Sequence, residues 1–174
     1  MFRHVLSPAL AALVLTSGVA MAQQSKPTDP QIAHIAYTAG EIDIKAAEQA
    51  LQKSKNKEVR SFAEDMVRDH KAVNEKALAL VKKLNVTPQD NDTSKALVKS
   101  ANAEHAKLAA LNGAAFDRAY AENEVKYHQA VNNALEKTLI PSATNAELKD
   151  LLSTGLKIFQ GHEKHAEQVV AALK

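Results

Sequence analysis

The apolar residues of this chain recur every three or four positions along most of its length, and this periodicity constrains the fold more than any other feature. Phe62, Met66 and Val73 fall on one face of a helix, because an α-helix turns by about 100° per residue. Residues that interrupt helices are rare, with 5 glycines and 5 prolines among 174 residues. The sequence therefore predicts an all-α protein.

Capping residues and breaks in the periodicity divide the chain into four long helices and one shorter one. Asp29 is predicted to cap the first helix, Pro141 to close the fourth, and Thr144 with Glu147 to open the last as a capping box. The expected helices are 30–53, 56–84, 94–111, 114–139 and a last one from Thr144 to the C-terminus. This order is typical of a four-helix bundle with an additional short helix in its middle connection.

The first residues have the pattern of a cleavable signal peptide. Arg3 precedes an apolar stretch from Val5 to Val19, and Ala20, Met21 and Ala22 supply the small-x-small cleavage pattern. The stretch is shorter than the roughly 20 residues of a membrane-spanning helix, so we expect no transmembrane segment in the mature chain. The predicted organisation is a signal peptide at 1–22, a polar leader at 23–29 and one bundle domain at 30–174.

Composition excludes several classes of chemistry. The chain has no cysteine, which excludes disulfides, thiolate metal sites and cysteine catalysis. A net charge of +2, few aromatic residues and no tryptophan argue against a nucleic-acid partner. No nucleophile motif such as Gly-x-Ser-x-Gly is present, so no catalytic residue is predicted and a non-enzymatic role is favoured.

Three histidines fall on the apolar faces of three different predicted helices. Helical wheels place His70, His128 and His162 among the leucine, valine, phenylalanine and alanine residues of the core stripes. An imidazole in such a place needs a hydrogen-bond partner or a metal ion, because burying an unsatisfied polar group is costly. The sequence therefore predicts a polar site inside the bundle.

Acidic and phenolic residues accompany these histidines. Asp43 points inward near the middle of the first helix, at the height where His70 and His128 lie on theirs. On the fourth helix Asp117 and Glu124 line the same flank as His128, and Tyr120 belongs to the core face. Convergence of these groups at the middle of the bundle is therefore geometrically possible.

Two interpretations of the site remain open. In the first, a divalent transition metal is bound by nitrogen from the three histidines and oxygen from Asp117 or Asp43, supported by Tyr120 and Glu124. In the second, neighbouring carboxylates, Tyr120 or Tyr127 satisfy the histidines as a structural network, and the protein is a non-catalytic envelope bundle for stress tolerance or partner binding.

The spacing of these residues argues against a di-iron oxidase and against one shared ion. Such oxidases carry Glu-x-x-His on two helices, and this sequence has none. A tight hairpin around Pro141 would place His128 opposite Gly155 and His162 opposite Ala121. The two histidines would then be separated by about 10 Å along the bundle axis. This separation therefore favours two small sites or none over one shared site.

Three segments resemble an exported bacterial family, the domain of unknown function 4142. They are Ser61 to His70 (SFAEDMVRDH), Phe116 to Tyr120 (FDRAY) followed by His128, and the helix around His162. The resemblance covers nearly all of the mature chain. It implies a ferritin-like helical fold in the bacterial envelope, periplasmic or associated with the outer membrane, without an established activity.

The resemblance also marks individual positions. The recurring residues of the family fall here on Asp117, Tyr120 and the three core histidines, and an acidic position matches Glu41. A helical wheel turns Glu41 outward, which predicts a surface salt bridge for it. Glu124 stands where the family is expected to have an uncharged residue.

Overall fold

The computed structural model describes residues 26–173, so the predicted signal peptide lies outside the described residues. Within this range there is no strand, and the all-α prediction is confirmed. No helix within it is long and apolar enough to cross a membrane. The elements are α1 (Asp29–Lys53), α2 (Lys57–Lys83), α3 (Asp92–Ala109), α4 (Gly113–Ala134), the π-helical turn η1 (Leu135–Leu139), α5 (Ile140–Ser142) and α6 (Ala146–Ala172).

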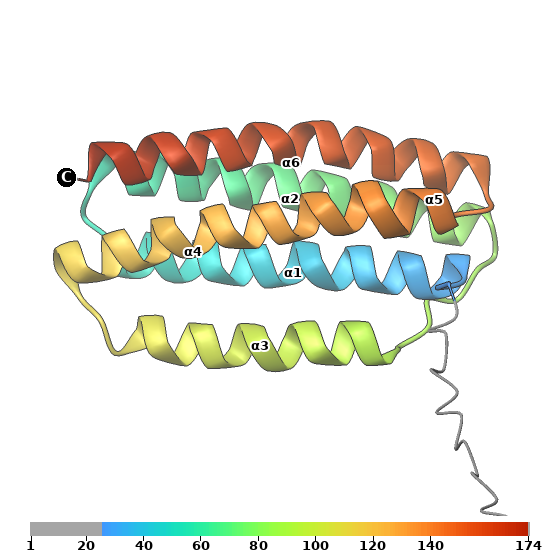
Figure 1. Ribbon diagram of the computed structural model, residues 1–174, viewed down its shortest axis with the longest axis horizontal. Helices are drawn as coiled ribbons and strands as arrows, with labels where there is room; N and C mark the ends of the chain where they lie inside the picture. The colour runs from blue at the N-terminus through green and yellow to red at the C-terminus, as the bar shows by residue number, and fades with distance from the viewer. Residues whose placement is uncertain (1–25, 174) are drawn as a thin grey trace, which may run out of the picture.

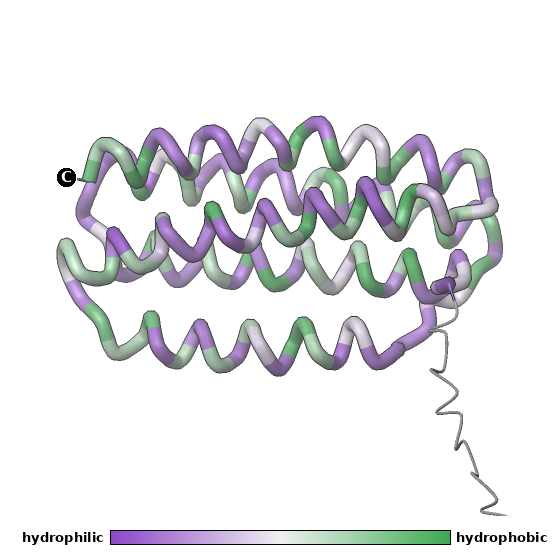
Figure 2. The backbone as a smooth tube through the Cα atoms, in the orientation of Figure 1, coloured by the Kyte–Doolittle hydropathy of each residue, from purple (hydrophilic) through white to green (hydrophobic). Residues whose placement is uncertain are grey.

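Four of these helices run side by side as the predicted bundle, namely α1, α2, α4 and α6 (Figure 1). The additional helix α3 lies outside the bundle against α1, and it buries only Ser94 and Leu108. Hydrophobic and hydrophilic residues alternate along every helix (Figure 2), as expected where one face of a helix packs and the other meets water.

Two apolar clusters make up the core. The first is centred on Phe62, Met66 and Phe116, and the second on Ile32, Leu135 and Leu152, with further residues of all four bundle helices. On each bundle helix a short run of residues separates the two clusters. The three predicted histidines, Asp43 and Glu124 occupy this layer, whereas Asp117 follows Phe116 at the level of the first cluster.

The caps of α1 and α6 differ from the sequence prediction. Thr28 is the N-cap of α1, and Asp29 instead accepts hydrogen bonds from the backbone and hydroxyl of Thr144 and from the backbone of Asn145 at 2.6–2.8 Å. Asn145 caps α6 by accepting from the backbone of Leu148 at 3.0 Å. The predicted capping box of Thr144 and Glu147 is therefore wrong, because Thr144 ties the start of α1 to the turn before α6.

Pro141 does not close the fourth helix, which continues through η1 and α5 to Ser142. In the π-helical turn the backbone N–H of Ile140 bonds the carbonyl of Leu135, so this turn holds an extra residue. The centre of the hairpin consequently moves beyond Pro141 towards Ala143. This shift changes which residues of α4 and α6 face one another.

Candidate metal centre

Three imidazole rings meet in the layer between the apolar clusters. His70 comes from α2, His128 from α4 and His162 from α6, and the centroids of their rings lie 5.3–5.8 Å apart. One ring nitrogen from each histidine lies within 4.8 Å of the other two. The predicted axial separation of about 10 Å between His128 and His162 is therefore wrong. The extra residue in η1 and the later turn slide α4 along α6 and bring these rings together.

Asp43 of α1 completes this group, so each bundle helix contributes one side chain. Its Oδ2 atom lies 3.0 Å from Nε2 of His70 and 3.2 Å from Nε2 of His128. The side chains of all three residues are at most 3% exposed. Within residues 26–173, neither carboxylate oxygen of Asp43 has a partner in hydrogen-bond geometry, and neither does Nε2 of either histidine. We call His70, His128, His162 and Asp43 the His₃Asp cluster.

Hydrogen bonds fix which nitrogen of His128 and of His162 carries the proton. Nδ1 of His128 lies 3.0 Å from the backbone carbonyl of Glu124, and only an N–H can bond a carbonyl. Nε2 of His162 lies 3.0 Å from Oδ2 of Asp69 and donates to it. The lone pair of His128 is therefore on Nε2, facing Asp43, and that of His162 is on Nδ1, which has no partner among the described residues.

The pKa shifts favour the forms that bind metal. Burial lowers the pKa of His128, and burial lowers the pKa of His162 to about 4 against the opposing effect of the hydrogen bond that His162 donates to Asp69. Burial would raise the pKa of Asp43, but interactions with His70 and His128 outweigh it and lower that pKa to about 2. At neutral pH His128 and His162 are neutral and Asp43 is ionised, as ligands must be.

Two distances in the cluster are close to those between ligand atoms around a bound ion. A tetrahedral ion with bonds of about 2.0–2.1 Å holds neighbouring ligand atoms about 3.3 Å apart. The contacts of Asp43 with the two Nε2 atoms, at 3.0 and 3.2 Å, are close to this value. A lone pair that faces a carboxylate is repulsive without a cation between them, so the cluster fits a cation-binding site.

Surrounding side chains orient the cluster and shield it. Arg68 donates to both carboxylate oxygens of Asp69, at 2.8 and 3.1 Å, and so fixes the acceptor of His162. Carboxylates in this position commonly orient metal-binding histidines. Phe159 stacks on His70 with ring centroids 4.5 Å apart and an angle of 5°, which keeps water from that face.

Glu124 lies beside the cluster. It is 1% exposed and forms a second group with Asp43 and His128, in which one ligand atom from each lies within 4.8 Å of the others. Burial and then the charge of Asp43 raise the pKa of Glu124 well above its usual range. This shift favours the protonated form of Glu124, and in that form its carboxyl group can donate to Asp43.

The remaining predicted residues lie outside the cluster. Asp117 is buried at 6% exposure towards the start of α4 and belongs to neither group of candidate ligands among the described residues. Tyr120 packs between Phe62 and Phe116, with each pair of ring centroids 6.1 Å apart. Glu41 accepts a hydrogen bond from Asn74 at 2.9 Å and makes no salt bridge within the described part of the chain, so that prediction is wrong.

Two contacts of the cluster were not predicted from the sequence, namely the hydrogen bond from His162 to Asp69 and the stacking of Phe159 on His70. Asp69 directly precedes His70, but on a helix adjacent residues point about 100° apart, so its contact with His162 across to α6 could not be derived from α2 alone. Phe159 lies three residues before His162 on the same helix face, and this spacing was a usable signal.

Comparisons with known proteins agree with this architecture. A family model described as "Domain of unknown function (DUF4142)" matches residues 14–169. No curated protein sequence matches the chain.

Two solved structures have similar folds. "CopM in the Cu(II)-bound form" has a TM-score of 0.65 and 16% identity, covering 86% of this chain and 100% of that one. A DUF305 fragment from Deinococcus radiodurans has a TM-score of 0.71 and 16% identity, covering 85% and 99%. At such identity the likeness shows the helical fold alone.

Proposed function

This chain belongs to the family described as domain of unknown function 4142, and since that description assigns no activity, we propose from the site itself that the protein binds a divalent transition-metal ion in the His₃Asp cluster. The observation that carries the proposal is the approach of Asp43 to two imidazole nitrogens without hydrogen-bond geometry. A bound cation would turn the repulsion between Asp43 and the lone pair on Nε2 of His128 into attraction.

The donor set favours Cu²⁺ or Zn²⁺. Three imidazole nitrogens and one carboxylate oxygen suit both ions, and Cu²⁺ generally binds such sites most tightly among divalent first-row metals. Thiolate ligands, which select Cu⁺, are absent because the chain has no cysteine. A similar fold is recorded for CopM with Cu(II) bound, which supports testing copper first.

The proposed role is to hold the ion rather than to catalyse a reaction. Catalytic zinc sites commonly use three protein ligands and keep one position open, whereas here Asp43 lies 3.0–3.2 Å from two of the three buried histidines that lie together. Together with the signal-peptide pattern of residues 1–22, this supports a carrier or buffer of a transition metal in the bacterial periplasm.

A structural network of histidines is the competing function, and two hydrogen bonds favour it. His162 donates to Asp69, and His128 donates to the carbonyl of Glu124, and neither bond requires an ion. These bonds satisfy one nitrogen on each ring. They leave Asp43 and His70 without partners among residues 26–173, which is why we favour the metal site.

Replacing a single carboxylate tests the proposal. Asp43→Asn keeps the size of the side chain but removes its charge, and Asp117→Asn is the matched control because Asp117 is equally a buried aspartate. We expect calorimetric titration with Cu²⁺ and Zn²⁺ to show one ion per parent chain. Asp43→Asn should weaken the affinity by about 100-fold or more, and Asp117→Asn by less than about threefold. Equal effects of the two substitutions would contradict the assignment.

A further inference from the structure

A large cavity connects the His₃Asp cluster with the space beneath α3. Its volume is about 1370 Å³, and it is lined by residues of α1, α3 and α4 together with Asp43, His70 and His128. The cavity exists because only two residues of α3 are buried, Ser94 near its start and Leu108 near its end. The middle of α3 therefore covers α1 without filling the space between them.

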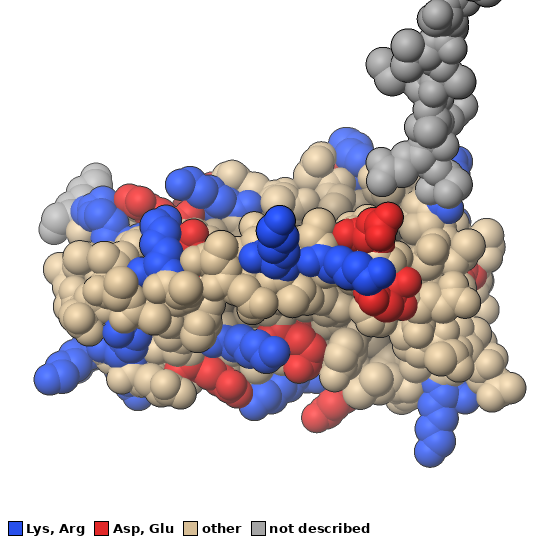
Figure 3. All heavy atoms as spheres, turned by 90° about the horizontal axis from the view of Figure 1, so that it is seen from below, with Lys and Arg blue, Asp and Glu red and all other residues tan. Residues whose placement is uncertain are grey.

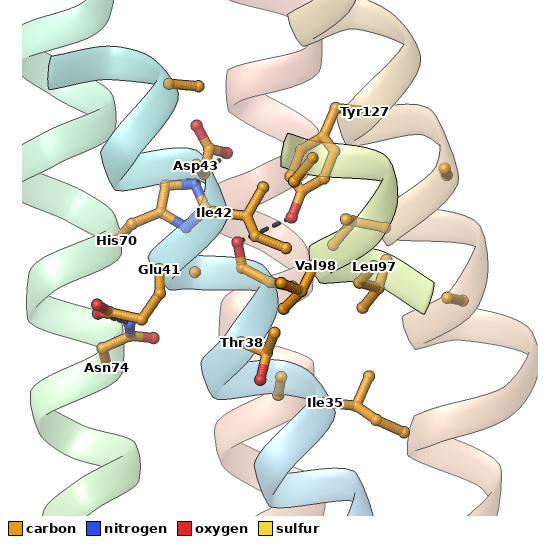
Figure 4. A pocket seen from close by; sticks show the side chains of 18 of the residues that line it. Ile35, Thr38, Glu41, Ile42, Asp43, His70, Asn74, Leu97, Val98 and Tyr127 are labelled. Carbon is orange, nitrogen blue, oxygen red and sulfur yellow. Dashed lines mark hydrogen bonds and ion pairs between the residues drawn. The ribbon is translucent and has the colours of Figure 1, made fainter. Parts of the chain in front are cut away.

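One arm of the cavity is mostly apolar, with Thr38, Glu41 and Asn74 as the polar residues that Figure 4 labels along it. In Figure 4, Asp43 and His70 lie towards one end of the drawn pocket and Ile35 at the other, and Leu97 and Val98 of α3 lie opposite α1. From Asp43 to Ile35 the distance along α1 is roughly 12 Å. Further apolar residues line the cavity around this arm, namely Val131, Ala134, Leu135, Leu139 and Leu152.

Polar side chains line the end of this arm near Asp43 and His70. Tyr127 donates its hydroxyl to the carbonyl of Ala39 at 2.8 Å (Figure 4), so its ring is held beside the metal cluster. On the face of the molecule on the side of α3, basic and acidic side chains are interspersed (Figure 3). The surface around α3 therefore does not favour a ligand of either charge. Any selection of a ligand by its charge has to come from the His₃Asp cluster inside the cavity.

The end of the cavity at the His₃Asp cluster would attract an anion once the cluster holds its metal ion. A divalent ion bound by three neutral imidazoles and one carboxylate keeps a net positive charge. Zn²⁺ can expand from four to five ligands, so an oxygen from outside the protein can join it. An apolar arm that ends at a positive, coordinating centre is complementary to a molecule with an apolar body and an anionic head.

From this geometry we propose that the cavity binds a linear aliphatic carboxylate, whose head coordinates the metal of the His₃Asp cluster and whose tail lies along α1 towards Ile35 beneath Leu97 and Val98. This inference rests on the proposed metal binding. The metal supplies the attraction for the head, and burial of methylene groups in the apolar arm supplies the attraction for the tail.

Calorimetric titration with decanoate and decanol tests both parts. The protein is loaded with Zn²⁺, freed of excess ion, and compared with metal-free protein. We expect one decanoate per chain, bound at least about tenfold more tightly than decanol to the loaded protein, and no such preference without metal. Val98→Trp places an indole in the arm from a residue that is 43% exposed, and it should weaken both ligands by about tenfold while metal uptake is unchanged.

Leu78→Trp is the matched control, because Leu78 is 48% exposed on α2 and does not line the cavity. It should change neither titration. If loaded protein binds no decanoate, or if Val98→Trp has no effect, the inference is overturned. If the chain takes up no metal, the proposed function fails, and so does coordination of the carboxylate head by the metal. Decanol binding then still decides whether the apolar arm holds an aliphatic chain.

Discussion

Replacing His162 by glutamine should separate the metal site from a structural network. The side-chain amide of the introduced glutamine can still donate to Asp69, so the hydrogen bond that His162 makes at 3.0 Å is largely kept. The unpartnered nitrogen Nδ1 is lost, and with it one of three imidazole ligands. Metal-free His162→Gln should therefore lose only about 0.5–1.5 kcal/mol of stability.

The effect on the metal-bound protein is much larger. At a metal concentration of about 100 times Kd, binding stabilises the parent by about 2.7 kcal/mol, which for a domain of this size raises Tm by about 5–11 °C. Loss of one nitrogen ligand should weaken binding by about 100-fold. The same metal concentration then equals Kd, and the stabilisation falls to about 0.4 kcal/mol, or about 1–2 °C.

Thermal melts followed by circular dichroism, with chelator and with Cu²⁺, measure both quantities. His165→Gln is the control, because His165 lies one turn further along α6 and contacts Asp65 at 3.7 Å with about a third of its side chain exposed. It should keep the full shift of the parent. If His162→Gln also keeps that shift, or if both variants lose it equally, the assignment of His162 as a ligand is refuted.

Further predictions concern pH, the helix connection and the shielding of the site. The pKa of His162 is about 4 in the folded chain against 6.5 in the unfolded one, so the unfolded state binds more protons between these values. Chemical denaturation at several pH values should show the metal-free protein losing stability as pH falls from about 6.5 to 4, and an unchanged stability over that window would contradict the shift. Asp29→Ala removes three hydrogen bonds to Thr144 and Asn145 and should cost about 1–2 kcal/mol in denaturation experiments without altering metal affinity. Phe159→Leu removes the ring stacked on His70 and should both lower the free energy of unfolding by about 1–2 kcal/mol and speed metal release to a chelator, which a purely packing role would leave unchanged.

The fold was largely predictable from the sequence, because it depends on periodicity that each helix carries by itself. Inward placement of His70, His128 and His162 follows from the apolar neighbours on each helix, and the structure agrees. Gly113, the first residue of α4, adopts the left-handed conformation that glycine accommodates readily, with φ of 57°. These are local properties of one helix or one turn.

The convergence of the site was not predictable in the same way. Whether His128 meets His162 depends on the register between α4 and α6, which one extra residue in η1 and the continuation of the helix past Pro141 decide. A π-helical turn leaves no clear mark in the spacing of apolar residues. The exclusion of Asp117 does not depend on that register, because Asp117 precedes His128 by eleven residues on α4, about 16 Å along the helix axis. Only Asp43 lies at the level of the histidines.

Electron paramagnetic resonance of the copper-loaded protein tests most directly whether the three core histidines bind one ion. We expect one Cu²⁺ per chain, with spectra that report three imidazole nitrogens, and with one nitrogen fewer in His162→Gln but not in His165→Gln. A chain that retains no copper, or that retains it with a spectrum unchanged by His162→Gln, would contradict it.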